Sequence, residues 1–386
     1  MQPFSFATTP QLLCEPGAAA RLAQLCQQRG ARRILIVSDP GIIRLGLLDA
    51  LLPGFTRARL GLEIFSDVGA DPSDTCVLSA VERARHIGAD LIVGFGGGSS
   101  MDVAKLVALL AHPECIQSLE ELYGVDRAQG RRLPLIQVPT TRWSPPGRRA
   151  RWAWCPRSCC RTWRCSMPNS PWACRRRSPQ PPASMPWFMN HGIDAMVHAI
   201  EAYTSKLKRN PLSSLLAREA LRLLASNLDQ AVHQGDNLAA RQAMLLGACL
   251  AGQAFANAPV AAVHALAYPL GAHFHVPHGL ANSLVLPHVM RFNRPQAFAD
   301  YAELAPALLG ERLRAGDAHE QCEQFIEELE QLAPRCGLPT RLREVDVPRE
   351  RLAQLAEDAL QQQRLLVNNP REVGLADALS LYEAAF

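Results

Sequence analysis

The stretch DLIVGFGGGSSMDVAKLVALL, residues 90–110, decides the fold class of the N-terminal half of this chain. Residues 91–96 form a short apolar run typical of a buried β-strand, and the residues around Asp102 and Lys105 follow the pattern of an amphipathic helix. Further strands are predicted at residues 34–37 and within PLIQVPTT, residues 134–141. Strands that alternate with helices predict an α/β domain with a parallel sheet, which binds ligands at the carboxyl ends of its strands.

Glycines and an aspartate end two of these predicted strands. Gly96, Gly97, Gly98 and Ser99 separate a strand from a helix, where backbone N–H groups can approach a pyrophosphate and the helix N-terminus favours its charge. The run lacks the GxGxxG fingerprint, and tight turns also use glycine. Asp39 follows the first strand and precedes a predicted Pro-Gly turn. It either bonds an adenosine ribose 2′-hydroxyl, which would repel a 2′-phosphate, or serves as a turn or cap residue.

Length and composition favour a soluble protein of two domains. The chain has 386 residues, 48% of them hydrophobic, so it can bury a large core. Its N-terminus lacks a basic region followed by an apolar one, and no run reaches the roughly 18 apolar residues of a membrane helix. Twelve cysteines without a regular framework fit reduced thiols. We therefore expect a cytoplasmic protein with no membrane partner.

One window, residues 142–187, has a composition unlike the rest of the chain. It holds ten arginines, all six tryptophans, five cysteines and nine prolines, and it holds no acidic residue. The net charge of the whole chain is +4, whereas the residues outside the window carry 30 basic and 36 acidic side chains. The prolines at 179, 181, 182 and 186 argue against a helix there. The basic charge of the protein therefore comes from this window alone.

Three interpretations of the window remain open. Its cysteines could bind zinc, although they contain no C-x2-C pair. Its arginines and tryptophans could contact phosphates and stack on bases of a nucleic acid. The third hypothesis is an out-of-frame segment, because a shifted frame of a GC-rich gene yields arginine, proline, serine, cysteine and tryptophan with few acids.

The pattern after the window is helical throughout. Asn210 and Pro211 are suited to the start of a helix that carries leucines at 212, 215, 216, 223 and 224. Residues 238–258, 319–336 and 348–364 behave in the same way. An all-α domain is therefore predicted to follow the α/β domain.

Two stretches of the helical half carry possible metal ligands. HGIDAMVHAIEAYTS, residues 191–205, places Asp194 and His198 four residues apart on one helix face. VHALAYPLGAHFHVPHGLANS, residues 263–283, adds His264 and His278. A carboxylate and three imidazoles suit a divalent first-row metal and leave room for a substrate oxygen. Each histidine could instead be a satisfied residue at a helix end, and His273 and His275 are further candidates by residue type.

These residues resemble the iron-containing alcohol dehydrogenase family, whose group also includes glycerol dehydrogenases and maleylacetate reductases. The resemblance is carried by GFGGGSSMDVAK, PLIQVPTT, GIDAMVHAIEAY, LAGQAFANAPVAAVHALAYPLGAHFHVPHGLANS and NNPREVGLADALSLYEAAF. It implies a dehydroquinate synthase-like architecture, with an α/β dinucleotide-binding domain at 1–187 and an all-helical metal-binding domain at 188–386. It also implies a catalytic metal in the cleft between them and a homodimer.

The resemblance assigns roles to particular residues. The implied metal ligands are Asp194, His198, His264 and His278. The implied cofactor-binding residues are Asp39, which would favour NAD over NADP, and Gly97, Gly98, Ser99, Asp102, Thr140 and Thr141. The metal would be Fe²⁺, with Zn²⁺ as the alternative, and it would act as a Lewis acid on the alcohol oxygen while hydride passes to nicotinamide.

Two departures from the family pattern have consequences. Many members carry a histidine, thought to help proton transfer, where this chain has Tyr268, and a tyrosine hydroxyl does not titrate near neutrality. The window replaces a glycine-rich loop and the strands after it, while keeping the family's length. A compensated pair of frameshifts explains this, and we expect it to impair folding or activity.

The sequence therefore predicts an NAD-dependent alcohol dehydrogenase that acts on a small-molecule alcohol or aldehyde and binds no nucleic acid. The alternatives are a maleylacetate reductase-like or other metal-dependent relative, and a non-catalytic remnant.

Overall fold

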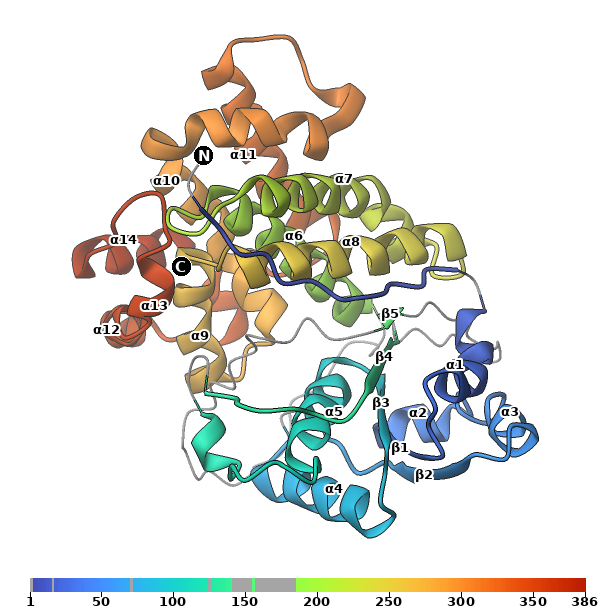
Figure 1. Ribbon diagram of the computed structural model, residues 1–386. Coiled ribbons are helices and arrows are strands. Elements are labelled where there is room, and N and C mark those ends of the chain that lie inside the picture. Colours follow the sequence, from blue (N-terminus) through green and yellow to red (C-terminus); the bar gives the residue numbers. More distant parts are fainter. Residues whose placement is uncertain (1–2, 16, 70–71, 124–126, 141–154, 157–184) are drawn as a thin grey trace. The chain divides into compact units, whose positions relative to one another are not determined.

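The computed structural model describes residues 3–15, 17–69, 72–123, 127–140, 155–156 and 185–386 (Figure 1). The chain divides into two compact units. One comprises Ala7–Asn169, and the other comprises Ser170–Phe386 together with Met1–Phe6.

The first unit is built on a sheet with strand order β2-β1-β3-β4-β5. The three predicted strands are confirmed as β1 (Arg33–Val37), β3 (Leu91–Gly96) and β4 (Leu135–Pro139), which run parallel to one another. β2 (Gly61–Phe65) pairs with β1 in parallel, and β5 (Cys155–Pro156) pairs with β4 antiparallel. The chain leaves β1 towards β2 on one side and reaches β3 on the other, so the strand order reverses at β1 and β3.

Helices cover both faces of the central strands, as a parallel sheet requires. Alternate β-residues such as Ile34, Ile36 and Val93 pack in one core with helices before and after β1. Leu35, Ile92 and their neighbours pack in a second core with α4 and α5. The helical elements are η1 (Ala18–Arg21), α1 (Leu22–Gln28), α2 (Pro40–Arg44), α3 (Leu52–Arg57), α4 (Asp74–His86), α5 (Gly98–Leu110) and η2 (Glu120–Leu122).

The second unit is helical over its described residues, as predicted (Figure 1). The long helix α10 packs against α6, α7, α9, α11 and α14, and the apolar side chains of these helices form one continuous core. The elements are α6 (Met185–Thr204), α7 (Pro211–His233), α8 (Leu238–Asn257), α9 (Ala262–Phe274), α10 (His278–Leu309), η3 (Gly310–Arg312), α11 (Ala318–Arg335), η4 (Leu342–Val345), η5 (Arg349–Arg351), α12 (Leu352–Leu360), α13 (Gln363–Leu366) and α14 (Leu375–Ala385).

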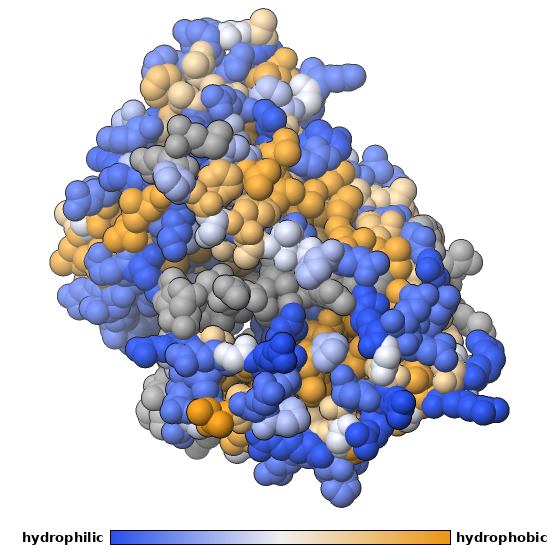
Figure 2. Space-filling view, viewed as in Figure 1, coloured by the Kyte–Doolittle hydropathy of each residue, from blue (hydrophilic) through white to orange (hydrophobic). Residues whose placement is uncertain are grey.

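α7 confirms its predicted start, but only some of its predicted leucines face the core. The Asn210 side chain accepts a hydrogen bond from the Ser213 N–H at 3.0 Å, which caps the helix. Leu212 and Leu215 are 45% and 55% exposed, whereas Leu224 is buried beside Ala217 and Leu221. Figure 2 shows apolar side chains gathered over the helical unit on the face in view.

The arginine-rich window lies outside the described residues except for β5 and residues 185–187. The zinc, nucleic-acid and frameshift interpretations of the window therefore concern residues that the structure does not describe. The expectation of no helix among its prolines is wrong at Pro186, which occupies the second residue of α6, a position where proline is tolerated.

Among the described residues, no single helix is long and apolar enough to cross a membrane, although α8 and α9 together, bent by 106°, pass that test.

Candidate metal centre

Three helices of the second unit carry the predicted metal ligands. α6 holds Asp194 and His198 one turn apart, while its apolar residues, such as Val197, pack into the core. His264 is the third residue of α9, and His278 is the first residue of α10. The structure therefore brings together residues from positions 194 to 278 of the chain.

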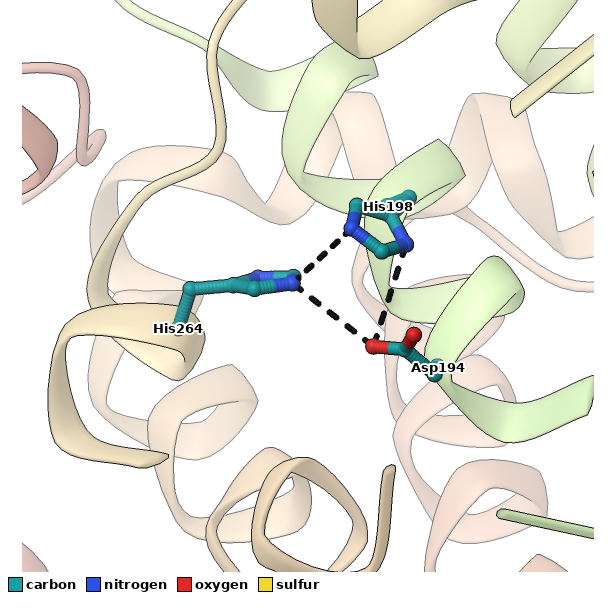
Figure 3. Close-up of side chains that lie close together, drawn as sticks. All are labelled: Asp194, His198 and His264. Atoms are coloured by element: carbon teal, nitrogen blue, oxygen red, sulfur yellow. Dashed lines mark hydrogen bonds and ion pairs between the residues drawn. The ribbon is translucent and has the colours of Figure 1, made fainter. Parts of the chain in front are cut away.

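Asp194, His198 and His264 point toward one another (Figure 3), with ligand atoms all within 4.8 Å of one another. Asp194 Oδ1 lies 3.8 Å from His198 Nδ1 and 3.7 Å from His264 Nε2. His278 joins them, because its Nε2 lies 3.5 Å from the same oxygen. The four predicted ligands thus form one cluster.

Asp194, His198 and His278 have the ionisation that a cation requires, whereas His264 holds an extra proton that a cation would have to displace. Burial lowers the pKa of His198 to about 3, against the opposing charge of Asp194. Burial also lowers the pKa of His278. Burial disfavours the charged ring of His264, but the charge of Glu201 and hydrogen bonds to Asp194 and Glu201 raise the pKa of His264 to about 9. Burial opposes ionisation of Asp194 too, but the three histidines hold its pKa far below the usual value.

The arrangement of acceptor atoms fits a divalent metal ion. His198 Nε2 and His264 Nε2 lie 3.1 Å apart, so two lone pairs would face each other unless a proton or a cation lies between them. One amide group, that of Asn282, donates to Asp194 Oδ1 at 2.6 Å and lies 3.3 Å from His278 Nε2. The buried Oδ1 of Asn282 has no hydrogen-bond partner among the described residues. One carboxylate oxygen and three imidazoles are ligands for zinc or iron.

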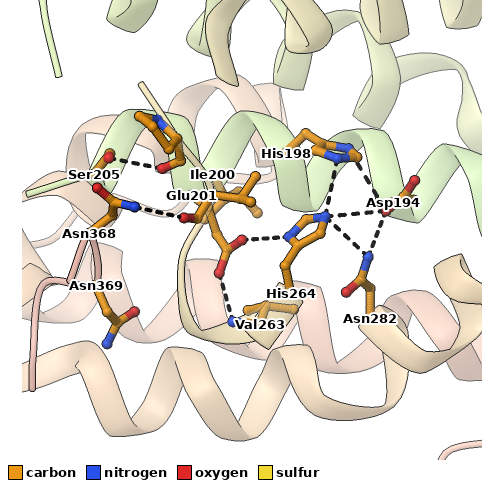
Figure 4. Close-up of polar contacts among 12 residues, drawn as sticks. Asp194, His198, Ile200, Glu201, Ser205, Val263, His264, Asn282, Asn368 and Asn369 are labelled. Carbon is orange, nitrogen blue, oxygen red and sulfur yellow. Dashed lines mark hydrogen bonds and ion pairs between the residues drawn. The ribbon is translucent and has the colours of Figure 1, made fainter. Parts of the chain in front are cut away.

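Two buried polar residues of this centre are absent from the sequence predictions. Glu201 binds His264 Nδ1 through its carboxylate at 2.6 Å, and Asn282 contacts Asp194 (Figure 4). A signal existed for each of them. Glu201 lies three residues after His198, and Asn282 four residues after His278, so each shares a helix face with a predicted ligand.

Tyr268, the predicted catalytic residue, lies beside the histidines. Its ring centroid is 5.8 Å from that of His278 and 6.4 Å from that of His264. Burial raises the pKa of the Tyr268 hydroxyl, against the nearby charge of Arg364, which also forms a hydrogen bond with it. The hydroxyl is therefore protonated at neutral pH.

The other two candidate histidines are not part of the cluster. His273 Nε2 lies 2.6 Å from Asp358 Oδ2, and these two side chains form a partly exposed pair at the surface. His275 is exposed and ends α9 in a left-handed conformation with φ 55°.

In the first unit, the strand ends place several predicted cofactor residues together. Asp39 caps α2, because its Oδ1 accepts hydrogen bonds from the N–H groups of Gly41 and Ile42 at 2.9 and 3.1 Å. The predicted Pro-Gly turn is thus wrong, since proline at the first position and the aspartate cap start a short helix. Thr140 donates its backbone N–H to the Gly96 carbonyl at 2.9 Å, so the ends of β3 and β4 meet there.

The glycine run forms the N-terminus of α5. Gly96 has φ 151°, which favours glycine, and Gly97 occupies the cap position without a side-chain cap from the described residues. A Cβ on Gly98 would meet nothing within 4 Å, so that backbone is open. Ser100 Oγ is buried and has no hydrogen-bond partner among the described residues. A helix end with open N–H groups and an unpartnered hydroxyl fits a phosphate.

Of the remaining predicted cofactor residues, two lie on α5 and one lies outside the described residues. Ser99 is the second residue of α5. Asp102 pairs with Lys105 one turn further along the same helix, at 2.8 Å. Thr141 lies outside the described residues.

Comparison with known families gives matches in both units. Residues 188–386 match the Fe-containing alcohol dehydrogenase family, C-terminal, and residues 9–142 match iron-containing alcohol dehydrogenase. Residues 143–187 belong to neither match. The chain is 35% identical over 377 residues to long-chain-alcohol dehydrogenase 1 of Geobacillus thermodenitrificans (strain NG80-2), covering 96% of this chain and 93% of that protein.

Solved structures share the fold. A 1,3-propanediol oxidoreductase superimposes with a TM-score of 0.83 and 28% identity, covering 100% of both chains. A sulfoacetaldehyde reductase from Bifidobacterium kashiwanohense, solved in complex with NAD+, superimposes with a TM-score of 0.78 and 22% identity, covering 100% of this chain and 99% of that one. The predicted fold class is confirmed.

Proposed function

The chain belongs to the iron-containing alcohol dehydrogenase family, and we propose that it oxidises an alcohol to an aldehyde or ketone with NAD, and catalyses the reverse reduction. The observation that carries this proposal is the convergence of Asp194, His198 and His264, with His278 beside them, from three helices. Such a ligand set supports a metal-dependent oxidoreductase.

The protein residues would perform separate tasks at the metal centre. Asp194, His198, His264 and His278 would hold a divalent ion, Fe²⁺ or Zn²⁺. The chemistry that such an ion supplies is Lewis-acid polarisation of an alcohol oxygen. Tyr268, protonated and beside His278, would donate a hydrogen bond or a proton to the substrate oxygen during reduction.

The first unit would bind NAD. The open N–H groups from Gly97 to Ser99 would hold the pyrophosphate at the start of α5, and the helix dipole would favour its charge. Asp39 would accept a hydrogen bond from the adenosine ribose through Oδ2, because Oδ1 is already used by the α2 cap. Asp102, Thr140 and Thr141 would line the same pocket.

The proposal also includes a domain boundary, an oligomeric state and a location in the cell. The domain boundary at 187/188 would fall in the first turn of α6. The chain would act as a homodimer in the cytoplasm. Light scattering of the purified protein would measure the assembly, and a monomer at assay concentration would contradict it.

The proposed function is tested by alcohol-dependent NADH formation in protein reloaded with Fe²⁺ or Zn²⁺ after chelation. His264→Ala should lower turnover by roughly 100-fold or more, because the metal loses a ligand. His273→Ala is the matched control, since His273 lies in the same helix but pairs with Asp358. Equal activity of the two variants would exclude the proposed centre, and wild-type protein that folds and binds NAD but has no detectable metal-dependent activity would exclude the function.

A further inference from the structure

Glu201 is a charged residue buried in the core of the second unit, with only 2% of its surface exposed. It lies on α6, one turn after His198. One carboxylate oxygen, Oε1, accepts the backbone N–H of Val263 at 2.7 Å, and the other, Oε2, lies 2.6 Å from His264 Nδ1 (Figure 4). Burial of a carboxylate is costly unless it is fully paired, so these two contacts require an explanation.

The first contact serves the start of α9. Ala261, the residue before this helix, provides no side-chain cap, and the Val263 N–H is one of the helix N–H groups that lack an intrahelical partner. Glu201 supplies the missing acceptor from another helix. Its negative charge also lies at the positive end of the α9 dipole.

The second contact fixes the ring of His264. An ionised carboxylate only accepts hydrogen bonds, so Nδ1 of His264 must carry a hydrogen. Nε2 then points away from Glu201, toward Asp194 Oδ1 at 3.7 Å and His198 Nε2 at 3.1 Å. A metal-binding histidine whose other nitrogen donates to a carboxylate is held in one tautomer and is a stronger ligand.

The loop before α9 has other anchors that do not touch the ring. Ser205 Oγ donates to the Pro259 carbonyl at 2.9 Å, and Asn368 Nδ2 donates to the Val260 carbonyl at 3.3 Å. Anchoring of the loop and orientation of the ring can therefore be separated by mutation.

We propose that Glu201 is a positioning residue that orients His264 toward the metal centre, so that metal affinity depends on its carboxylate. This inference rests on the proposed metal centre and goes beyond its four ligands.

The test compares Zn²⁺ affinity of the full chain, measured by competition with a chromophoric chelator. Glu201→Gln keeps the size of the side chain but leaves one oxygen for two N–H donors. It should weaken Zn²⁺ binding by about 10- to 100-fold, the usual effect of losing such a partner. Ser205→Ala removes one loop anchor and leaves the contact between Glu201 and His264 intact. The Zn²⁺ affinity of this variant should stay within about twofold of wild type, a smaller change than the loss of a ligand's hydrogen-bond partner causes.

Glu201→Asp is the second variant, and it keeps the inference testable if Glu201→Gln does not fold. It keeps the negative charge but is shorter by one methylene, so it should support the fold, checked by circular dichroism, and still bind Zn²⁺ more weakly than wild type. In Zn²⁺-loaded wild type, long-range ¹H–¹⁵N spectra of histidine should show His264 protonated at Nδ1 and metal-bound at Nε2.

Each outcome has a defined meaning. Wild-type affinity in Glu201→Gln and Glu201→Asp overturns the inference and leaves the metal centre standing. Equal loss in Ser205→Ala and Glu201→Gln also overturns it, since Glu201 would then only anchor the loop. Failure of wild-type protein to bind Zn²⁺ contradicts the proposed centre itself, and with it this inference.

Discussion

At the scale of single residues, Asp39 combines a structural role with a proposed recognition role. Its Oδ1 caps α2 through Gly41 and Ile42, while Oδ2 lies at the end of β1 near Gly96. Asparagine caps helices as well as aspartate does. Asp39→Asn should therefore retain stability but remove the charge that repels a 2′-phosphate. We expect the affinity for NADP relative to NAD to rise roughly fivefold or more, as measured by titration calorimetry.

Asp39→Ala is the control for this prediction, because it removes both the charge and the cap. It should also lower the free energy of unfolding by about 0.5–2 kcal/mol. An unchanged preference for NAD in both variants would show that Asp39 is only a cap.

His288 on α10 should make stability depend on pH. Burial and the charge of Arg341 lower the pKa of His288 in the folded chain, so the unfolded chain takes up the proton more readily. Stability from this residue is present above the unfolded pKa of about 6.5 and is lost as the pH falls below it. His288→Gln should therefore show a smaller loss of melting temperature than wild type between about pH 7 and pH 5. Parallel pH profiles would contradict the prediction.

The metal ligands differ in how far the sequence could predict them. Asp194 and His198 share a helix face by spacing alone, whereas His264 and His278 were assigned through residue type and family resemblance. Glu201 and Asn282 gave only a weak signal, because a polar residue on an apolar helix face does not identify its partner. Their partners lie on other helices, and only the packing of those helices brings them together.

At the scale of elements, the contact between β3 and α5 depends on Gly94. A Cβ at Gly94 would lie 2.9 Å from the Cβ of Ala104 and would also clash with the side chain of Gln137, which donates to the Met101 carbonyl. Gly94→Ala should lower the free energy of unfolding by about 1–3 kcal/mol, measured in urea.

Gly98→Ala, at the first residue of α5, is the matched variant for Gly94→Ala in β3. The space around Gly98 is open, so stability should be unchanged or raised by up to about 1 kcal/mol. NAD affinity should nevertheless fall, because the methyl group would project from the proposed phosphate-binding backbone. If Gly98→Ala bound NAD as tightly as wild type, the pyrophosphate could not bind at the start of α5.

Element type was predictable where the pattern was strong. The apolar runs of β1, β3 and β4 predicted buried strands correctly, since strands covered on both faces carry few polar residues. β2 was missed, because this edge strand is only partly buried and its pattern is weak. The pattern of α7 did not separate inward from outward leucines, since Leu212 and Leu215 are exposed whereas Leu221, Leu224 and Leu228 are buried.

At the scale of the whole molecule, the window at 142–187 separates two regions that each match the family. Both family matches stop at its borders, and it alone makes the chain basic. We expect resequencing of codons 138–195 to show an insertion and a compensating deletion relative to the present sequence. A second read identical to the first would mean that the window is genuine, and turnover typical of the family by that chain would refute the expectation that it is impaired.

The central claim is that Asp194, His198, His264 and His278 bind one metal ion. The most direct measurement is the Zn²⁺ stoichiometry of the metal-free full chain by equilibrium dialysis, for wild type, His264→Ala and His273→Ala. We expect one bound ion per chain for wild type and His273→Ala, and much weaker binding for His264→Ala. Equal binding by all three proteins, or none by wild type, would contradict it.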